Sequence, residues 1–245
     1  MSNNFAVLLD GGFLRHKLST RHASLDAEGI CSFASQVLAM PCVTGMNLHR
    51  IYFYDARPLE EVARTPLGGD EIDFGSSRVA ARNRRVQNTL IRSPFFALRF
   101  GELLHEGWRL RKRVLEQPGP RVEIGPGDLE PSIRQKGVDM RIGLDIASLT
   151  LKRHAQVIVL VTGDSDFVPA MKFARREGAQ LFLITLGHGI RDSMREHADL
   201  VIDEFPLPAG ANDLSEASRP PVQAIYLNQQ LRAAHVGVKH DVLRL

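Results

Sequence analysis

The sequence lacks the features that mark membrane, secreted and disulfide-rich proteins. No apolar run reaches the length needed to cross a membrane. The N-terminus has no basic segment and meets Asp10 after only five apolar residues, so we expect no secretory signal. The only cysteines, Cys31 and Cys42, have neither metal-ligand spacing nor a disulfide pattern. We expect structural thiols in a protein of the reducing cytoplasm.

Several functional motifs are missing as well. No strand is followed by a glycine-rich phosphate-binding loop. None of the nine histidines pairs with a cysteine or serine in a catalytic spacing, so we expect them to be surface or core residues. Aromatic residues make up 7% of the chain, and few lie among the basic residues, which gives no indication of stacking on bases. Carboxylates are the remaining candidates for the chemistry.

The composition is that of a globular protein with alternating strands and helices. Of the 245 residues, 44% are hydrophobic and 24% are charged. Strands are predicted at 5–9, 49–54, 156–161, 180–185 and 200–202, with a hairpin whose strands are 95–103 and 108–115. Helices are predicted at 12–17, 30–40, 77–91, 138–152, 168–177 and 190–197. This alternation indicates an α/β fold with a mainly parallel sheet and right-handed crossovers.

The chain divides into a main domain and a tail. Residues 1–205 contain the alternating elements, and the Pro- and Gly-containing stretches 56–75 and 118–131 are expected to be loops or insertions. Residues 206–245 are predicted to be a Pro-rich linker followed by a helix at 222–235. We expect this tail to be a docking element or a homodimer contact.

Acidic residues follow two buried-looking strands. Asp10 comes directly after the first strand, and Asp164 and Asp166 follow the strand at 156–161. The carboxyl ends of parallel strands meet at one edge of a sheet, where ligands bind. Clustered carboxylates repel one another unless a cation neutralises them, and oxygen ligands favour Mg²⁺, Mn²⁺ or Ca²⁺ over zinc. The alternative for each residue is a turn or helix cap.

The predicted helix 138–152 carries two further acids. Asp139 shares a helix face with Ile142 and Ile146, which should pack inward, so its carboxylate needs a partner. Its alternative role is a favourable acid in the first helical turn. Asp145 lies on another stripe, one turn from Arg141, and a simple ion pair between the two is its alternative role.

Two arginine-rich clusters point to a polyanionic partner. The net charge is only +3, but basic residues concentrate in two stretches. The first cluster contains Arg78, Arg82, Arg84, Arg85 and Arg92, and the second contains Arg109, Arg111, Lys112 and Arg113. Arginines beside an acidic metal pocket would suit a phosphate polymer. For each cluster the alternative is a solvated face.

Four sequence blocks resemble a known family. They are Val7-Leu8-Leu9-Asp10-Gly11-Gly12, Lys136-Gly137-Val138-Asp139, Thr162-Gly163-Asp164-Ser165-Asp166-Phe167-Val168-Pro169, and Ser193 with Ala198-Asp199. Over about residues 5–205 the chain resembles an NYN domain of the LabA-like group, which is related to the PIN and flap-endonuclease nucleases. The resemblance implies a Rossmann-like three-layer sandwich, PIN-like, with an inserted hairpin.

The resemblance also implies a function. It implies an RNA-cleaving centre dependent on Mg²⁺ or Mn²⁺, and RNA rather than DNA is favoured by the resemblance alone. The implied metal-binding and catalytic residues are Asp10, Asp139, Asp164 and Asp166, with Asp145 as a lesser metal candidate. Lys136 and Ser193 are expected to hold the phosphate, and the further substrate-binding candidates are Thr162, Ser165, Arg82, Arg85 and Arg111.

One departure from the family and one partial likeness to another enzyme class keep other functions open. Phe13 stands where family members often carry an asparagine, which is the motive for a non-catalytic RNA-binding or regulatory module. A strand ending in aspartate also begins haloacid dehalogenase phosphatases, but Gly12 stands where their second acid belongs. Three assay results would separate these functions. RNA cleavage indicates the nuclease, RNA binding without cleavage indicates the binding module, and hydrolysis of small phosphoesters indicates the phosphatase.

Overall fold

The computed structural model describes residues 3–19, 24–116 and 121–205. The strands are β1 (Asn4–Asp10), β2 (Asn47–Ala56), β3 (Val62–Arg64), β4 (Glu71–Asp73), β5 (Phe96–Leu110), β6 (Leu129–Lys136), β7 (Val157–Val161), β8 (Gln180–Ile184) and β9 (Leu200–Ile202). The α-helices are α1 (Gly11–Leu18), α2 (Ala27–Leu38), α3 (Arg78–Ile91), α4 (Lys112–Leu115), α5 (Val138–Leu151), α6 (Val168–Arg176) and α7 (Asp192–Glu196). Single 3₁₀ turns are η1 (Pro41–Val43), η2 (Pro126–Asp128) and η3 (Ser165–Phe167).

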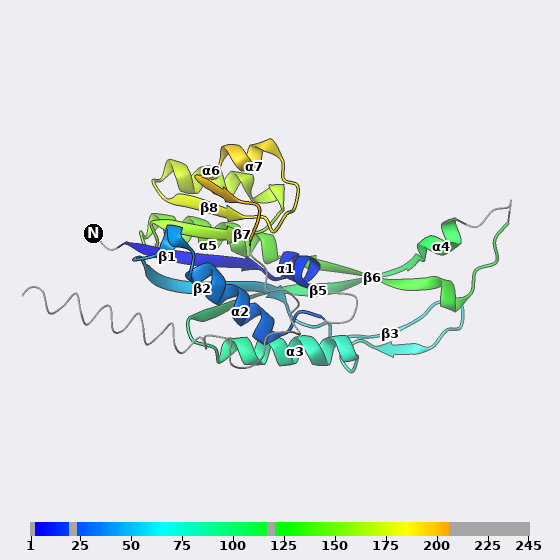
Figure 1. The fold of residues 1–245 in the computed structure, drawn as a ribbon. Coiled ribbons are helices and arrows are strands. Elements are labelled where there is room, and N and C mark those ends of the chain that lie inside the picture. The colour runs from blue at the N-terminus through cyan, green and yellow to red at the C-terminus, as the bar shows by residue number, and fades with distance from the viewer. Residues whose placement is uncertain (1–2, 20–23, 117–120, 206–245) are drawn as a thin grey trace, which may run out of the picture.

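Among the described residues, seven strands form one sheet in the order β6-β5-β2-β1-β7-β8-β9 (Figure 1). Every neighbouring pair is parallel except β5 with β6. The predicted α/β fold with a mainly parallel sheet is therefore confirmed. Because the parallel strands run the same way, the carboxyl ends of β1, β2 and β7 lie at one edge of the sheet.

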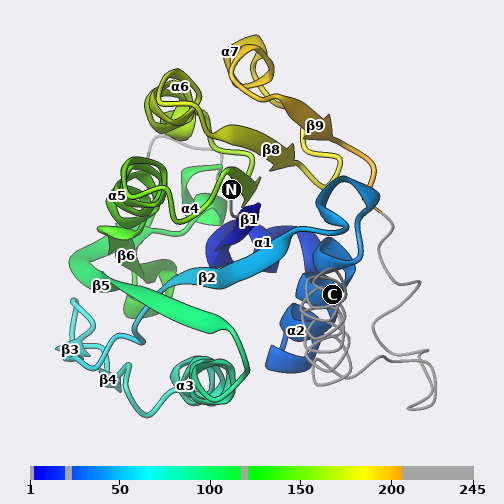
Figure 2. The same ribbon diagram turned by 90° about the vertical axis from the view of Figure 1, so that its left-hand side faces the viewer.

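Both faces of the sheet are covered by helices (Figure 2). In β1, Phe5, Val7 and Leu9 pack toward α1, α2 and α3, whereas Ala6 and Leu8 pack toward α5 and α6. A strand buried on both faces must be apolar throughout, which explains why the central strands are unbroken hydrophobic runs and not alternating patterns. The sheet is thus the middle layer of a three-layer sandwich.

Helices α2 and α3 begin at side-chain caps that the sequence supplies. Asp26 accepts a hydrogen bond from the backbone N–H of Gly29, and Ser77 accepts one from Ala80. The first cap starts α2 at Ala27, three residues before the predicted start at position 30. A side chain that satisfies a free N–H of the first turn fixes where the chain enters the helix.

The predicted hairpin of strands 95–103 and 108–115 is wrong. β5 continues without a turn to Leu110, and its antiparallel partner is β6, which begins at Leu129. Gly107 has a φ of 102° within a register shift between His105 and Trp108, so this glycine forms a bulge and not a turn. β5 and β6 form an arm that extends beyond the carboxyl edge of the sheet, with α4 near its tip (Figure 1).

Of two other expectations, one is met in part and one stays a prediction. The stretch 56–75, expected to be a loop, contains the short antiparallel pair β3 and β4. The predicted linker, helix and dimer contact at 206–245 lie outside the described residues. No helix in the described ranges is both long and apolar enough to cross a membrane.

Asp203 directly follows β9, and its hydrogen bonds make the stability of the fold depend on pH. It accepts hydrogen bonds from the hydroxyl of Thr185 and the guanidinium of Arg195, and these two bonds hold the pKa of Asp203 below its usual value. A carboxyl group whose pKa is lower in the folded than in the unfolded protein stabilises the fold at pH values above its unfolded-state pKa. This stabilisation is lost as the pH falls through the folded-state pKa.

We therefore expect Asp203→Asn to be less stable than wild type at neutral pH, with the difference shrinking as pH falls from about 6 to about 2. Urea denaturation at several pH values measures this difference. A difference independent of pH would show that the carboxylate charge contributes nothing.

Candidate acidic site

The carboxylate of Asp10 is held by hydrogen bonds from the residues that follow β1 and β7. It ends β1 and caps α1, where its Oδ1 accepts a hydrogen bond from the backbone N–H of Phe13 at 3.1 Å. Its Oδ2 accepts a bond from the hydroxyl of Thr162, which follows β7, at 3.0 Å. Burial raises the pKa of Asp10, the hydrogen bonds oppose that shift, and the charge of Asp164 raises it further. The carboxylate is therefore fixed in orientation and partly desolvated.

Asp164 and Asp166 lie on the loop after β7. The backbone N–H of Asp164 donates to the Thr162 hydroxyl at 3.2 Å, and Asp164 caps η3 by accepting from the N–H of Asp166 at 2.9 Å. Both acids are exposed. The fully buried Thr162 thus connects Asp10 with the Asp164 loop through one oxygen atom. We assign its hydroxyl to positioning these aspartates and not to substrate contact.

Asp139 joins the site from the first turn of α5. Asp139 is exposed, but nearby protein partly desolvates its carboxyl group. This desolvation is the main reason that the pKa of Asp139 is raised. The other three predicted carboxylates raise it further by repulsion. In order of effect they are Asp164, Asp10 and Asp166. Residues separated by about 150 positions in the chain therefore lie within electrostatic range of one another.

The acids do not stand at ion-ligand distances. Within the described parts of the chain, no three His, Cys, Asp or Glu side chains converge closely enough to hold an ion. The donor set nevertheless suits a hard divalent cation, because it consists only of carboxylate oxygens. Asp10 also keeps acceptor capacity, since the hydrogen bonds from Phe13, Thr162 and Gly12 do not fill its about four lone-pair positions.

Asp145 has other partners. Its Oδ2 accepts a hydrogen bond from the Tyr54 hydroxyl at 2.9 Å and pairs with Nε of Arg99 at the same distance. The ion pair with Arg141, the alternative role of Asp145, does not form, because Arg141 donates to the backbone carbonyl of Phe100. Asp145 is not among the groups that shift the pKa of Asp139. It ties α5 to β2 and β5.

A buried carboxylate that the sequence analysis did not select lies beside this site. Asp55, in β2, is only 2% exposed and receives a two-pronged ion pair from Arg15 of α1. The same carboxylate accepts bonds from Nε2 of Gln87 in α3 and from the N–H of Ala56. The sequence signal was available, since Asp55 ends a predicted strand just as Asp10 does. Its buried partners show that it is a structural link between α1, β2 and α3.

An aromatic pair flanks the Asp164 loop. The ring of Phe13 packs edge-on against the ring of His188, with 5.7 Å between their centroids. Both rings touch Gly163 so closely that a Cβ there would lie 2.3 Å from Cδ2 of His188. No spacing in the sequence indicated His188, which follows two residues of positive φ, Leu186 and Gly187. The Phe13 side chain, at the position where family members often carry an asparagine, thus fills space beside the acids.

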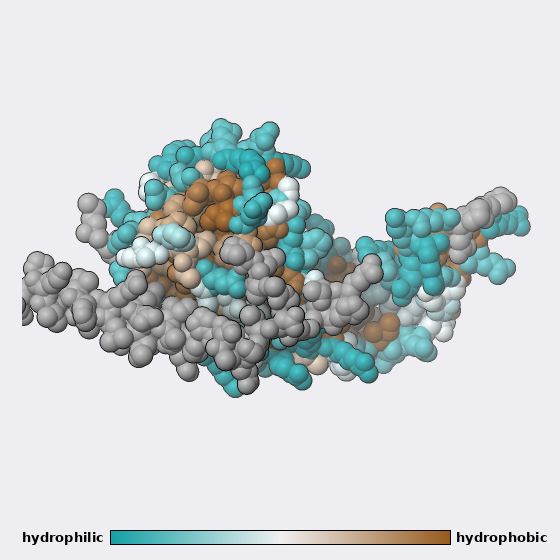
Figure 3. Space-filling model, viewed as in Figure 1, coloured by the Kyte–Doolittle hydropathy of each residue, from teal (hydrophilic) through white to brown (hydrophobic). Residues whose placement is uncertain are grey.

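The two basic clusters differ in their pairing. Every basic residue of the second cluster, on the arm, lies within ion-pair distance of an acid. The pairs are Arg109 and Arg111 with Glu130, Lys112 with Glu116, and Arg113 with Asp128. The arm tip is mostly hydrophilic on the face shown in Figure 3. Pairing favours the solvated-face alternative for this cluster, including Arg111.

The first cluster is different because α3 contains no acidic residue. Arg82 donates to the hydroxyl of Ser24, and Arg84 pairs with Glu60. Within the described ranges, Arg78, Arg85 and Arg92 form no ion pair with an acid, and all three are exposed. The outer face of α3 therefore carries uncompensated positive charge.

The remaining predicted contacts are dispersed. Lys136 ends β6 and pairs with Glu106 on the arm at 3.4 Å. Ser193 lies half-buried in α7, and Ser165 lies in η3 between Asp164 and Asp166. Asp199, part of the last resembling block, accepts from the N–H of Leu181 and pairs with Arg175. The structure thus places Ser165 beside the acids and gives Asp199 a structural role.

The chain is similar to two known proteins and matches one family model. The chain is 32% identical to an uncharacterised protein of Methanocaldococcus jannaschii over 81 residues, covering 32% of this chain and 34% of the relative. The chain thus spans about a third of the relative's length. A crystal structure of a protein of unknown function from Vibrio parahaemolyticus matches 82% of this chain and 92% of its own, with 12% identity and a TM-score of 0.44. The NYN domain model matches residues 4–207, and the chain belongs to the NYN domain family.

Proposed function

We propose that the protein is a divalent-metal-dependent ribonuclease that hydrolyses RNA phosphodiester bonds at the acidic site. The observation that supports this most strongly is that four acids from three separate segments lie within electrostatic range of one another, so that burial and then the charges of the other three acids raise the pKa of Asp139. Structural ion pairs would bring opposite charges together, whereas here like charges meet at the ligand-binding edge of a parallel sheet. The NYN family is nuclease-like, and the four sequence blocks favour its LabA-like group.

The cation would be Mg²⁺ or Mn²⁺, held by Asp10, Asp139, Asp164 and Asp166 after rotation of their side chains. When bound, it would stabilise negative charge on the oxygens of the scissile phosphate. Burial and then repulsion raise the pKa of Asp139, and the positive charge of the cation would offset the repulsion.

The chain's own residues supply the orientation. The Phe13 N–H and the Thr162 hydroxyl hold both oxygens of Asp10, so this carboxylate loses little freedom on binding an ion. The same hydroxyl accepts from the N–H of Asp164, and the two loops therefore keep a fixed spacing. Ligands held by hydrogen bonds from outside the ion's own shell bind more tightly than free ones.

RNA would approach along the positive face of α3. Arg82 and Arg85 lie on this helix, which has no acid to compete with phosphate. We propose Lys136, Ser165 and Ser193 as further phosphate contacts, with Lys136 leaving Glu106 when RNA binds. The ion-paired arm, including Arg111, contributes less.

Metal restoration tests the proposal. Labelled structured and unstructured RNAs are incubated with wild-type protein in chelator, and then with Mg²⁺ or Mn²⁺ in excess. We expect binding without cleavage in chelator and cleavage once the metal is restored. Hydrolysis of a small chromogenic phosphoester, measured in parallel, should stay at background.

A second candidate function is RNA binding without cleavage. Two observations favour it: the described acids do not converge at ligand distances, and Phe13 fills space beside them. RNA that stays intact after metal is restored, with binding unchanged, would select this function over the nuclease.

A further inference from the structure

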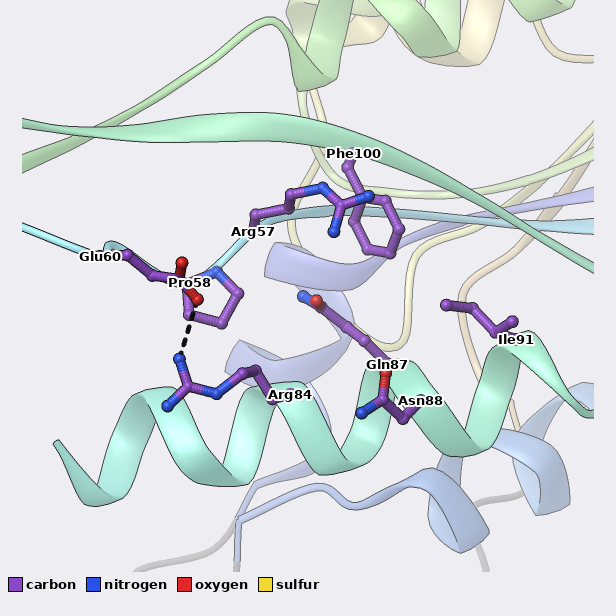
Figure 4. Close-up of a pocket in the computed structure, with 8 residues that line it drawn as sticks. All are labelled: Arg57, Pro58, Glu60, Arg84, Gln87, Asn88, Ile91 and Phe100. Carbon is purple, nitrogen blue, oxygen red and sulfur yellow. Dashed lines mark hydrogen bonds and ion pairs between the residues drawn. The ribbon is translucent and has the colours of Figure 1, made fainter. Parts of the chain in front are cut away.

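A pocket of about 250 Å³ lies at the same sheet edge as the acidic site but on the side of α3 (Figure 4). Its wall is formed by α3, by the chain that leaves β2, and by β5. The lining residues are Arg57, Pro58, Glu60, Arg84, Gln87, Asn88, Ile91 and Phe100. Neither the acidic site nor the family assignment accounts for it.

The lining combines a positive charge with a flat apolar surface. The guanidinium of Arg57 lies over the ring of Phe100, 4.6 Å from its centroid, and forms no ion pair with any described acid. Arg84 is balanced by Glu60 at 3.0 Å, so the charge left unpaired in the pocket is that of Arg57. Asn88 is exposed and offers both an amide donor and an acceptor. A ligand with one phosphate and one planar base matches this set.

The back of the pocket is rigid. The side chain of Gln87 is 4% exposed and donates to Oδ2 of Asp55 and to the carbonyl of Ala56, each at 2.9 Å. Asp55 is in turn held by Arg15 of α1. Ala56, which directly precedes Arg57, is thus held by hydrogen bonds to buried side chains. This makes the back of the pocket a preformed feature and not a surface irregularity.

The pocket also lies at a useful distance from the acids. Asp10 in β1 is level with Tyr54 in β2, and Asp55 is level with Phe100 in β5. Two strand spacings, about 10 Å, therefore separate the end of β1 from the pocket floor. A single strand of RNA can cover that separation with a few nucleotides.

We propose that this pocket binds one nucleotide of the RNA strand that the acidic site cuts, with the Arg57 guanidinium moving from the Phe100 ring to a phosphate and the base taking its place on the ring. The inference rests on the proposed ribonuclease function. It gives the enzyme a subsite a few nucleotides from the cleaved bond, and this subsite selects flexible, unpaired RNA because a paired base cannot enter a pocket.

The decisive test compares Arg57→Gln with Arg50→Gln. Arg50 lies in β2, seven residues before Arg57 and toward the opposite end of that strand. Like Arg57, it is exposed and forms no ion pair with a described acid. Binding of a labelled single-stranded RNA in chelator is measured by fluorescence anisotropy. We expect Arg57→Gln to weaken binding about tenfold, and Arg50→Gln to change it by less than about twofold. Equal losses in both variants, or no loss in either, would overturn the subsite.

Competition identifies what the pocket recognises. A nucleoside monophosphate should displace the RNA from wild type but much less readily from Arg57→Gln, whereas inorganic phosphate alone should compete weakly with both. Phosphate competing as well as the nucleotide would refute the base contact. In 4-thiouridine RNA crosslinked in chelator, the labelled peptide should contain Phe100, and labelling confined to other peptides would also refute it.

The cleavage assay keeps the two proposals apart. Arg57→Gln should raise KM about tenfold and change kcat by less than about twofold, because a remote binding contact acts on ground state and transition state alike. If wild type does not cut RNA at all, the ribonuclease proposal fails, and the binding comparison still decides whether the pocket takes a nucleotide.

Discussion

Asp164→Asn is expected to lower the rate of metal-dependent RNA cleavage on the order of 100-fold or more, while RNA affinity in chelator stays within about twofold. Asparagine keeps the oxygen that accepts from the N–H of Asp166, so the η3 cap survives. Only the negative charge is lost, and with it the attraction for a cation. Single-turnover cleavage at saturating Mn²⁺ measures the rate, and thermal denaturation checks the fold.

Asp145→Asn provides the matched control. Asp145 is also an acid near this edge, but it pairs with Arg99 and Tyr54 and not with the other aspartates. We expect its replacement to reduce stability and to leave single-turnover cleavage within a few-fold of wild type. If Asp145→Asn is as inactive as Asp164→Asn, the acidic centre has been placed in the wrong position. If Asp164→Asn cleaves like wild type, the mechanism is wrong.

Asp55→Ala is expected to lower the free energy of unfolding by about 3–5 kcal/mol. The substitution leaves the guanidinium of Arg15 without its partner, and it removes one of two acceptors from the buried amide of Gln87. Removing one member of a buried charge pair costs far more than the pair contributes as a whole, because the other member stays desolvated. Urea denaturation followed by circular dichroism measures the change.

The comparison for Asp55→Ala is Arg109→Ala. Arg109 forms an ion pair of 2.9 Å with Glu130 on the solvent-exposed arm, where loss of the pair should cost less than about 1 kcal/mol. Similar costs for the two substitutions would contradict the view that burial makes the Asp55 link important. Because Gln87 forms the back of the nucleotide pocket, Asp55→Ala should also weaken RNA binding at temperatures where the protein remains folded.

The sequence predicted the central sheet well because its signals are local. The runs at 5–9, 156–161 and 180–185 are apolar without alternation, as strands buried on both faces must be, and each is confirmed within a residue or two. The grouping of Asp10 with Asp164 followed from the same reasoning. The residues that directly follow parallel strands lie together at the carboxyl edge of the sheet.

Other features depend on partners that the sequence does not show. Gly107 looks like a turn residue, but whether a glycine forms a turn or a bulge depends on the strand that pairs with it, and that strand begins more than twenty residues later. Asp145 and Arg141 are one helical turn apart, yet each bonds to residues of the sheet instead. The basic residues of the arm are paired with acids of the same arm, so counting arginines along the chain overestimated their availability.

Asp10 serves at once as the cap of α1 and as a proposed ion ligand. Alanine at this position would fray the start of the helix that carries Arg15, so an inactive alanine variant would report folding and chemistry together. Asparagine retains the cap oxygen and removes only the charge. Genetic screens that rely on alanine would therefore misjudge this carboxylate, and the choice of replacement decides what such an experiment reveals.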